Sequence, residues 1–308
     1  MNNALAPKFL FLVFFFFSHF LFSQLASTNP QVWERVNPSS REATRCKDEN
    51  LLNFHCGIKE KALKKYIKYS KNRSHTLSVV HTSKEDETIW DNSDNGVSLG
   101  NTKYKRGQIS DKVVQKPSIF TFTASADSEN KADSLKIRFS DQNLYELIFI
   151  SRKAQMMELN KVHSYLSIKY GISLEKGKYI GSNGKLIWDP AKHAEFKYRP
   201  TGLGRDDGNE LYQKQSSNQA DQFLAIGMNT INRTNSENPA IIDNNNFVMW
   251  SDDNKAMSLK SEKDLDVLER NWEITFIGGK IPKTDYQVRI KKRSFQPSFI
   301  AAFLLDAA

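Results

Sequence analysis

The stretch that decides the fold is LYELIFISRKAQMMELNKVHSYLSIKYG, residues 144–171. Its first seven residues form an apolar run interrupted by Glu146, a pattern typical of a strand buried on both faces. Apolar residues then recur in steps of 3, 3, 4 and 4, the period of a helix, at Met156, Leu159, Val162, Leu166 and Tyr170. Gly171 stands where a left-handed glycine ends a helix. The stretch therefore predicts a buried strand and then a helix over about 154–170.

Strand signals fill the chain on both sides of this stretch. Alternating or apolar runs of strand length lie at 75–81, 118–124, 135–139, 186–188, 223–227, 247–250, 272–276 and 286–290. Turn-rich sequence separates them, as in DNSDNG at 91–96, the glycine- and Asp-rich loop predicted at 201–210, and an Asn-rich linker at 229–246. The predicted fold class is mainly β, with two β-sandwich or jelly-roll-like domains joined by one α-helix (about 154–170).

The N-terminus reads as an export signal. Eight of the 20 Phe lie in the first 22 residues, behind one charge at Lys8, and a small residue, Ser23, follows the apolar run. We predict a signal peptide at 1–23, with an uncleaved membrane anchor as the alternative. No later run approaches 18 apolar residues, so no transmembrane segment is expected after cleavage. The expected localisation is secreted or cell surface.

The net charge of +9 is spread along the chain. Residues 24–150 hold 20 basic and 16 acidic side chains, and residues 151–308 hold 23 and 19, so each part carries about four excess positive charges. Because the two signs are interspersed, we expect no nucleic acid partner. One local exception is KEKALKKYIKYSKNR at 59–73, a short amphipathic helix or a Lys-rich edge strand. Its candidate polyanion-binding residues, with a solvated face as the alternative, are Lys61, Lys64, Lys65 and Lys68.

Cys46 and Cys56 are the only two cysteines. An oxidising compartment permits a disulfide that closes the short loop between them. Two free thiols are the alternative. A metal site with His55, His75 or His81 is disfavoured because the spacing fits no closed zinc pattern.

The deciding stretch also resembles a known kind of domain. Glu146 and Arg152 match the last strand of concanavalin A-like (LamG-type) jelly rolls. The exit helix of those domains is matched by Val162, Tyr165, Leu166, Lys169, Tyr170 and Gly171. Gln155 stands where those domains carry a capping Ser, so we expect a weaker cap. The resemblance implies a degenerate jelly roll over residues 24–152 and a connecting helix over 153–170.

A second resemblance runs from Asn160 to Arg289. Its motifs, in family-like order and spacing, are IWDP (187–190), TGLGRDD (201–207), LYQKQS (211–216), FLAIG (223–227), FVMWSDDN (247–254) and LERNWEI (268–274). Together they resemble an uncharacterised domain of large exported Bacteroidetes cell-surface proteins, which commonly use type IX secretion. The resemblance implies a β-sandwich domain at 171–293 and no reaction. Residues 294–308 form an irregular or truncated tail, and we expect the chain to be the front part of a larger surface protein.

Two acidic pairs are candidate calcium ligands, Asp206 with Asp207 and Asp252 with Asp253, since loop carboxylates are hard oxygen ligands. The alternative is that they cap turns and bond their own backbone. Arg205 is expected to pair with a neighbouring carboxylate. No other cofactor is expected.

Sugar-stacking aromatic residues are the other candidates, because aromatic faces suit that contact. Trp188, Trp250 and Trp272 qualify, but each lies in an apolar strand pattern that favours a core position.

The expected function is an exported, non-enzymatic cell-surface module: a spacer, an adhesin component or a weak glycan binder. Its expected partners are an extracellular glycan or other surface proteins. The alternative is a carbohydrate-active enzyme on the jelly roll, which needs two carboxyl groups facing each other across a sugar site in residues 30–150.

Overall fold

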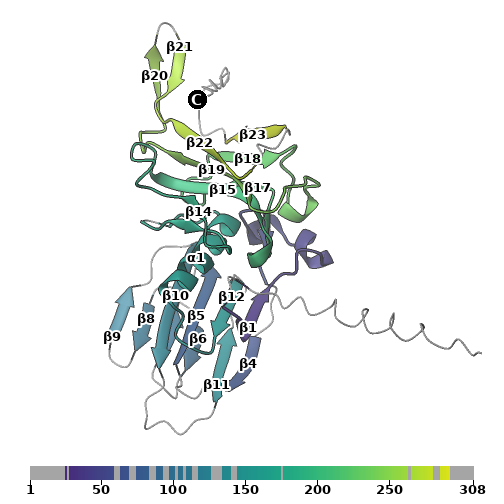
Figure 1. Ribbon diagram of the computed structural model, residues 1–308, viewed down its shortest axis with the longest axis vertical. Helices are drawn as coiled ribbons and strands as arrows, with labels where there is room; N and C mark the ends of the chain where they lie inside the picture. The colour runs from purple at the N-terminus through teal and green to yellow at the C-terminus, as the bar shows by residue number, and fades with distance from the viewer. Residues whose placement is uncertain are drawn as a thin grey trace, which may run out of the picture.

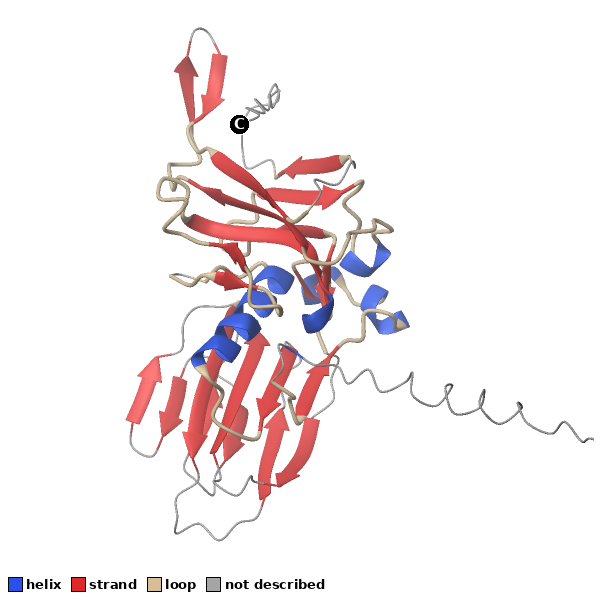
Figure 2. Cartoon of the chain, in the orientation of Figure 1, coloured by secondary structure: helices blue, strands red, loops and turns tan. Residues whose placement is uncertain are grey.

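The computed structural model describes residues 25, 28–58, 63–68, 74–82, 88–92, 97–100, 103–106, 109–112, 117–125, 134–139, 144–174, 176–262, 265–279 and 285–291. The predicted signal peptide and tail lie outside this part of the chain. Within it the fold is mainly β, as predicted, with several antiparallel sheets and one α-helix, α1 (Met156–Tyr170). Figures 1 and 2 show α1 between two groups of strands.

The first group holds a four-stranded antiparallel sheet in the order β1-β12-β5-β10. Its strands are β1 (Val32–Arg35), β12 (Leu144–Ile150), β5 (Ser74–His81) and β10 (Ser118–Ser125). A two-stranded sheet pairs β11 (Ser134–Phe139) with β4 (Leu63–Lys68), and a four-stranded meander runs through β6 (Thr88–Asn92), β7 (Val97–Gly100), β8 (Lys103–Arg106) and β9 (Ile109–Lys112). A short hairpin, β2 (Leu51–Leu52) with β3 (His55–Cys56), stands apart, flanked by the 3₁₀ turns η2 (Arg41–Thr44) and η3 (Asp48–Asn50).

The second group holds two further main sheets. One has the order β16-β15-β19-β22 and consists of β16 (Leu211–Gln213), β15 (Tyr198–Asp206), β19 (Asn246–Asp252) and β22 (Trp272–Ile277). The other, β17-β18-β23, consists of β17 (Gln215–Ser217), β18 (Leu224–Met228) and β23 (Tyr286–Ile290). Smaller elements are β13 (Tyr179–Ile180), β14 (Leu186–Trp188), η5 (Asp207–Asn209), η6 (Asn235–Glu237) and the hairpin β20 (Leu259–Glu262) with β21 (Leu265–Leu268), which projects from the top in Figure 1.

The helix begins and ends as its sequence dictates. Glu158 accepts a hydrogen bond from the backbone N of Gln155 at 2.8 Å, and Arg152 holds the Glu158 carboxylate in place. Gln155 and Glu158 together form a capping box, in which Gln155 takes the position of the Ser. Gly171 ends the helix in the left-handed region, at φ 64°, as predicted. At the first position of the predicted apolar stripe, Met156 is 73% exposed, so burial starts further along the helix.

The core consists of two clusters that share strand β19. One cluster packs α1 residues such as Val162 and Leu166 between Ile148 of β12 and Met249 of β19. The other packs the opposite face of β19, with Trp250, against β18 residues such as Ile226. The layers are therefore the β1-β12-β5-β10 sheet, α1, the β16-β15-β19-β22 sheet and the β17-β18-β23 sheet. Because sheets cover α1 on both sides, every residue from Ser164 to Tyr170 is buried.

The predicted loop at 201–210 is a strand over most of its length, so this prediction was wrong. Residues 201–206 belong to β15, which pairs with β19. Gly202 lies opposite Met249 and Gly204 opposite Phe247. A Cβ on either glycine would lie within 2.3 Å of its partner's side chain. These glycines therefore serve the close approach of two large core side chains and mark no turn.

Candidate functional site

The first predicted calcium pair divides between two separate interactions. Asp206 is 1% exposed and accepts hydrogen bonds from the backbone N of Ser182 at 2.7 Å, from the Ser182 hydroxyl and from Asn209 at 2.9 Å. Asp207, on η5, forms an ion pair with Arg205 at 2.6 Å. The expected carboxylate partner of Arg205 is therefore Asp207. The two carboxylates hold two different loops against β15.

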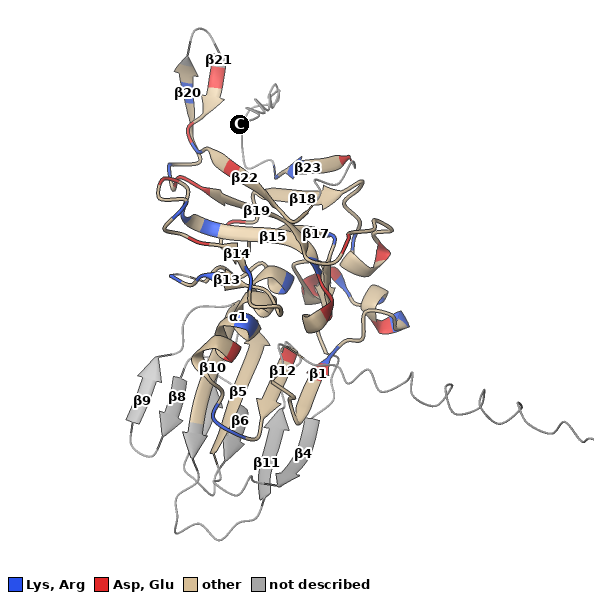
Figure 3. Ribbon diagram, in the orientation of Figure 1, with Lys and Arg blue, Asp and Glu red and all other residues tan. Residues whose placement is uncertain are grey.

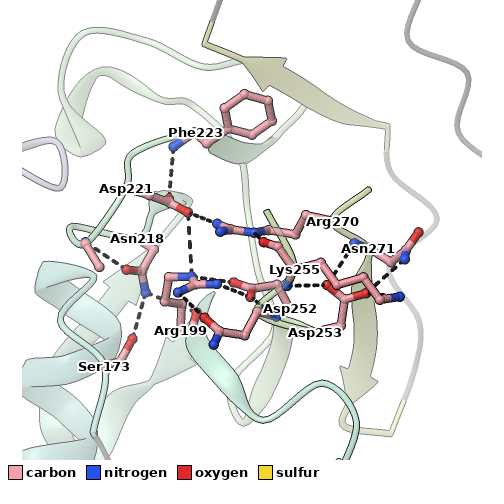
Figure 4. A network of polar contacts seen from close by, with 12 residues as sticks. Ser173, Arg199, Asn218, Asp221, Phe223, Asp252, Asp253, Lys255, Arg270 and Asn271 are labelled. Atoms are coloured by element: carbon pink, nitrogen blue, oxygen red, sulfur yellow. Dashed lines mark hydrogen bonds and ion pairs between the residues drawn. The ribbon is translucent and has the colours of Figure 1, made fainter. Parts of the chain in front are cut away.

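The second predicted pair belongs to the polar network of Figure 4. Asp252 is buried and receives both the Nε and an Nη of Arg199, and Nε lies 2.7 Å from Asp252 Oδ2. Arg270 binds Asp221 at 2.8 Å. Asp253 instead pairs with Lys255 at 2.9 Å, and Asn271 donates to it at 2.9 Å.

The environment of Asp253 keeps it ionised. Burial by itself raises the pKa of Asp253, but the Lys255 ammonium and the Asn271 amide outweigh burial and lower it to about 2. Among the described residues no three His, Cys, Asp or Glu side chains gather as metal ligands would. The four aspartate carboxylates each accept from donors of the protein, and the two predicted calcium pairs do not meet each other. Calcium binding at these residues stays a prediction.

The two cysteines form a disulfide. Cys46 and Cys56 are bonded with Cα atoms 5.6 Å apart, and the closed loop contains η3 and the hairpin β2–β3. Arg233, from the second half, donates to the carbonyls of Cys46 at 2.8 Å and Thr44 at 2.5 Å. The disulfide loop is thereby attached to a segment nearly 190 residues away.

The lysine-rich segment contains the strand β4, which pairs with β11. Of the two shapes expected for this segment, the strand is the one observed. Lys64, Lys65 and Lys68 lie on β4, while Lys61 lies outside the described residues. In the second half, basic and acidic residues are scattered along the chain (Figure 3). The polyanion-binding residues stay a prediction.

The tryptophans occupy core positions. Trp188 is 2% exposed and stacks on His193, with ring centroids 5.3 Å apart. Trp250 is equally buried, and half-buried Trp272 stacks on Phe223. The structure thus places these rings inside the protein and not on a sugar-binding face.

Sequence reasoning missed the most concentrated polar site, the buried charge cluster, formed by Trp33, Arg35, Glu146, Tyr165, Lys169 and Tyr170. The Glu146 side chain is fully buried on β12. Its Oε1 accepts from Trp33 at 2.5 Å and from Tyr165 at 2.8 Å. Its Oε2 accepts from Lys169 at 2.6 Å and from Tyr170 at 2.8 Å. Four donors therefore surround one buried carboxylate, as a buried charge requires.

Arg35 extends the buried charge cluster to the second half of the chain. Its guanidinium donates to the Tyr165 hydroxyl at 2.9 Å, lies 3.7 Å from the centre of the Trp33 ring, and forms an ion pair with Glu210. Glu210 follows η5 in the second half. The cluster thus links β1, β12 and α1 to the start of β16.

The protonation states in the buried charge cluster follow from its geometry. Burial by itself raises the pKa of Glu146, but the Lys169 and Arg35 charges outweigh burial and keep it below its ordinary value. Burial lowers the pKa of Lys169 to about 8, against the opposing attraction of Glu146. Burial raises the pKa of Tyr165 and Tyr170 well above 10, so both hydroxyls stay donors. At neutral pH the cluster therefore holds a closed Glu146–Lys169 ion pair.

The tip of the disulfide loop reaches the same end of the helix. Asn53 donates to the carbonyl of Lys169 at 3.0 Å and accepts from the backbone N of Ser217 at 2.8 Å. His55 lies 2.6 Å from Gln213 Oε1. Burial and, to a smaller extent, Lys169 lower the pKa of His55 to about 3, so the ring is neutral. Asn53 satisfies helix carbonyls that would otherwise have no donor.

A signal for this cluster was present in the sequence. Tyr165 and Lys169 lie four residues apart, one turn of a helix, and Lys169 interrupts an apolar run that ends at Gly171. A lysine among buried helix positions needs a buried counter-charge, and Glu146 interrupts the preceding strand in the same way. These two charged residues, Glu146 and Lys169, are the two partners of the buried ion pair.

Residues 158–306 match a family described as Domain of unknown function (DUF8202). The match begins inside α1, three residues after Gln155. The helix is therefore part of the family domain as well as part of the core beneath β12. No curated protein and no solved structure matches the chain. Within the described residues, no helix has the length and apolar character needed to cross a membrane.

Proposed function

We propose that the chain is an exported, non-enzymatic cell-surface module that holds two β halves in one fixed arrangement. In this role it is a rigid spacer or adhesin component. Three features support the proposal: the signal-like residues 1–23, the disulfide of Cys46 with Cys56, and a second half that resembles a domain of exported Bacteroidetes surface proteins.

The observation that carries the proposal is the shared core around α1. A flexible tether between domains leaves a polar, solvated helix, whereas seven consecutive residues of α1 are buried. The ion pair between Lys169 and Glu146 then fixes the helix to β12, and Asn53 fixes its end to β17. A load or ligand at one end of such a module keeps its orientation relative to the other end.

The carbohydrate-active alternative receives less support from the geometry. Glu146, the carboxylate at the end of the jelly-roll-like pattern, is fully buried and already holds four donors. A glycosidase acid or nucleophile must instead reach the sugar.

Export is tested by producing the full chain with a C-terminal tag in a bacterial host that has an outer membrane. We expect the protein outside the cytoplasm with a new N-terminus near Gln24 and an oxidised Cys46–Cys56 pair, both read from intact mass. A protein retained inside with residues 1–23 intact and both thiols free contradicts export.

Rigidity is tested by native-state hydrogen exchange at increasing urea concentration. If the halves form one unit, amides of β12 and of β19 open with a single common free energy. Separate opening of the two strands at different urea concentrations contradicts the rigid module. Sustained release of reducing sugar from glycans by the purified chain replaces the proposal with the enzyme.

A further inference from the structure

A groove of about 370 Å³ opens where the hairpin β2–β3 meets the β17-β18-β23 sheet. Leu51 and Phe54 form its hairpin side, and Phe223 and Ala225 form part of its floor. Its volume lies toward the lower end of the range for small-molecule pockets. The groove lies apart from the buried charge cluster and from both predicted calcium pairs.

The cations of the groove exceed its anions. Arg289, Lys291 and Arg233 line it together with one carboxylate, Asp48, which lies 3.0 Å from Arg233. Arg289 and Lys291 are exposed, and no carboxylate of the described residues forms an ion pair with either. Arg289 donates to the carbonyl of Ile231 at 3.0 Å, and the positive charges of Arg289 and Lys291 line the open groove without a carboxylate partner among the described residues.

Polar groups that suit a hydroxylated ligand accompany these charges. The amide side chains of Gln219, Gln222 and Asn232 line the groove. Ser217 also lines it, but its hydroxyl is buried beneath the groove surface. The amide side chains can both donate to and accept from the hydroxyl groups of a ligand.

The phenyl ring of Phe54 is held in place at a structural cost. Asn53 and Phe54 have φ of 46° and 66°, as the two central residues of a tight hairpin turn require. Glycine ordinarily takes the second position, and a bulky residue there is an outlier. The Asn53 contacts to α1 and β17, with a 2.8 Å bond from Asn235 N to the Phe54 carbonyl, hold this turn. Strain of this kind is retained where a side chain is needed.

We propose that this groove binds an acidic oligosaccharide. Arg289 and Lys291 bind its carboxylate or sulfate groups, the amide side chains bind its hydroxyls, and the Phe54 ring packs against a sugar face. The inference adds a ligand to the proposed surface module and does not depend on the rigidity of that module.

The test is calorimetric titration of the full chain with four probes of equal length. These are an oligogalacturonate, a sulfated heparin oligosaccharide, a neutral malto-oligosaccharide and an oligoglutamate peptide. We expect an acidic oligosaccharide to bind at least about tenfold more tightly than the neutral one, with affinity that falls as salt rises. The double variant Arg289→Gln/Lys291→Gln should lose about tenfold or more, because charged hydrogen bonds are lost. Lys185→Gln, an exposed lysine away from the groove, is the matched control and should bind like the parent.

Phe54→Gly separates folding from binding. Glycine adopts positive φ without strain, so this variant should keep or raise the melting temperature while it loses affinity for the oligosaccharide. Four results overturn the proposal: no binding of either acidic oligosaccharide, equal binding of the neutral one, unchanged binding by Arg289→Gln/Lys291→Gln, or equal binding of oligoglutamate. The variant Lys61→Gln/Lys64→Gln/Lys65→Gln/Lys68→Gln can give a fifth result that overturns the proposal. If it alone abolishes binding, the ligand site is the lysine-rich segment.

Discussion

At the scale of single residues, the fold should lose stability when either Lys169 or Glu146 loses the other as its buried ion-pair partner. Lys169→Met leaves the Glu146 carboxylate buried with three donors and without its ion-pair partner, so that Arg35 is the nearby cation that remains. Removing one partner of a buried pair costs about 3–5 kcal/mol. We expect a loss of that size in the free energy of unfolding, measured by urea denaturation.

The matched control is the double variant Glu146→Gln/Lys169→Met, which removes both charges. It should recover part of the loss, since no unpaired charge then remains inside the protein. A double variant that is less stable than Lys169→Met alone contradicts the assignment of the ion pair.

His55 makes stability depend on pH. Its folded pKa of about 3 lies below the ordinary value near 6.5, so the unfolded chain binds a proton that the folded chain rejects. Its contribution to stability is present above pH 6.5 and is lost as pH falls toward about 3. Over this range His55 lowers the free energy of unfolding by at most about 1.4 kcal/mol for each pH unit.

His55→Gln removes this titration and should flatten the decline between about pH 6.5 and pH 4.5, measured as the free energy of unfolding at each pH. The contribution of Glu146 to stability is lost only at lower pH, because its folded pKa lies below the ordinary value. An unchanged slope in His55→Gln assigns the decline to other groups.

Sequence patterns predicted the role of a residue well where a neighbour in the sequence determines that role. Gly171 at the helix end and the pairing of Arg205 with Asp207 are local matters, and both agree with the structure. The contact of Glu146 with Trp33 could not be predicted, because Trp33 is 113 residues away and the sequence pattern does not show which distant residues meet. Asn238 was likewise assigned to a linker, yet it is fully buried and donates to the carbonyls of Met228 and Thr230.

At the scale of elements, the end of α1 offers a matched pair of substitutions. Gly171 and Gly184 both have positive φ, 64° and 79°. A Cβ on Gly171 would lie 2.2 Å from the carbonyl O of Ser217, whereas a Cβ on Gly184 would meet nothing within 4 Å. Gly184→Ala should cost about 1 kcal/mol from backbone strain alone, and Gly171→Ala at least about 3 kcal/mol. Equal losses, measured by urea denaturation, contradict the close packing of α1 against β17.

Strands with apolar side chains were predicted from the sequence, whereas the strand that contains glycines at its close contacts was missed. The apolar runs at 144–150 and 247–250 became β12 and β19, both buried along their whole length. β15 was read as a loop because its glycines resemble turn residues, although here they admit Phe247 and Met249. The meaning of such a glycine is decided by the opposite strand, which the local sequence does not contain.

For the whole molecule, the family domain and the folded unit differ in extent. The family match starts at residue 158, but Val162, Tyr165 and Leu166 lie in the core cluster that also contains Ile148 of β12. A fragment of residues 153–308 therefore exposes the β12-facing side of α1 and loses the Glu146 partner of Lys169.

We expect this fragment to bind a hydrophobic dye and to exchange the amide hydrogens of α1 much faster than the full chain does. The full chain at equal concentration is the control. A monomeric fragment with full protection of α1 contradicts the shared core.

The position of β1 and the disulfide loop has a consequence for the order of folding. β1 pairs with β12, more than 110 residues later, and Arg233 reaches back to Cys46 across 187 residues. Such non-local contacts give a high contact order, which slows folding. A chain made N-terminus first, at about 5–20 residues per second, completes these contacts only when most of it has emerged. The segments from β1 to the disulfide loop thus wait many seconds for their partners, so the nascent chain depends on chaperones more than a fold built from local contacts would.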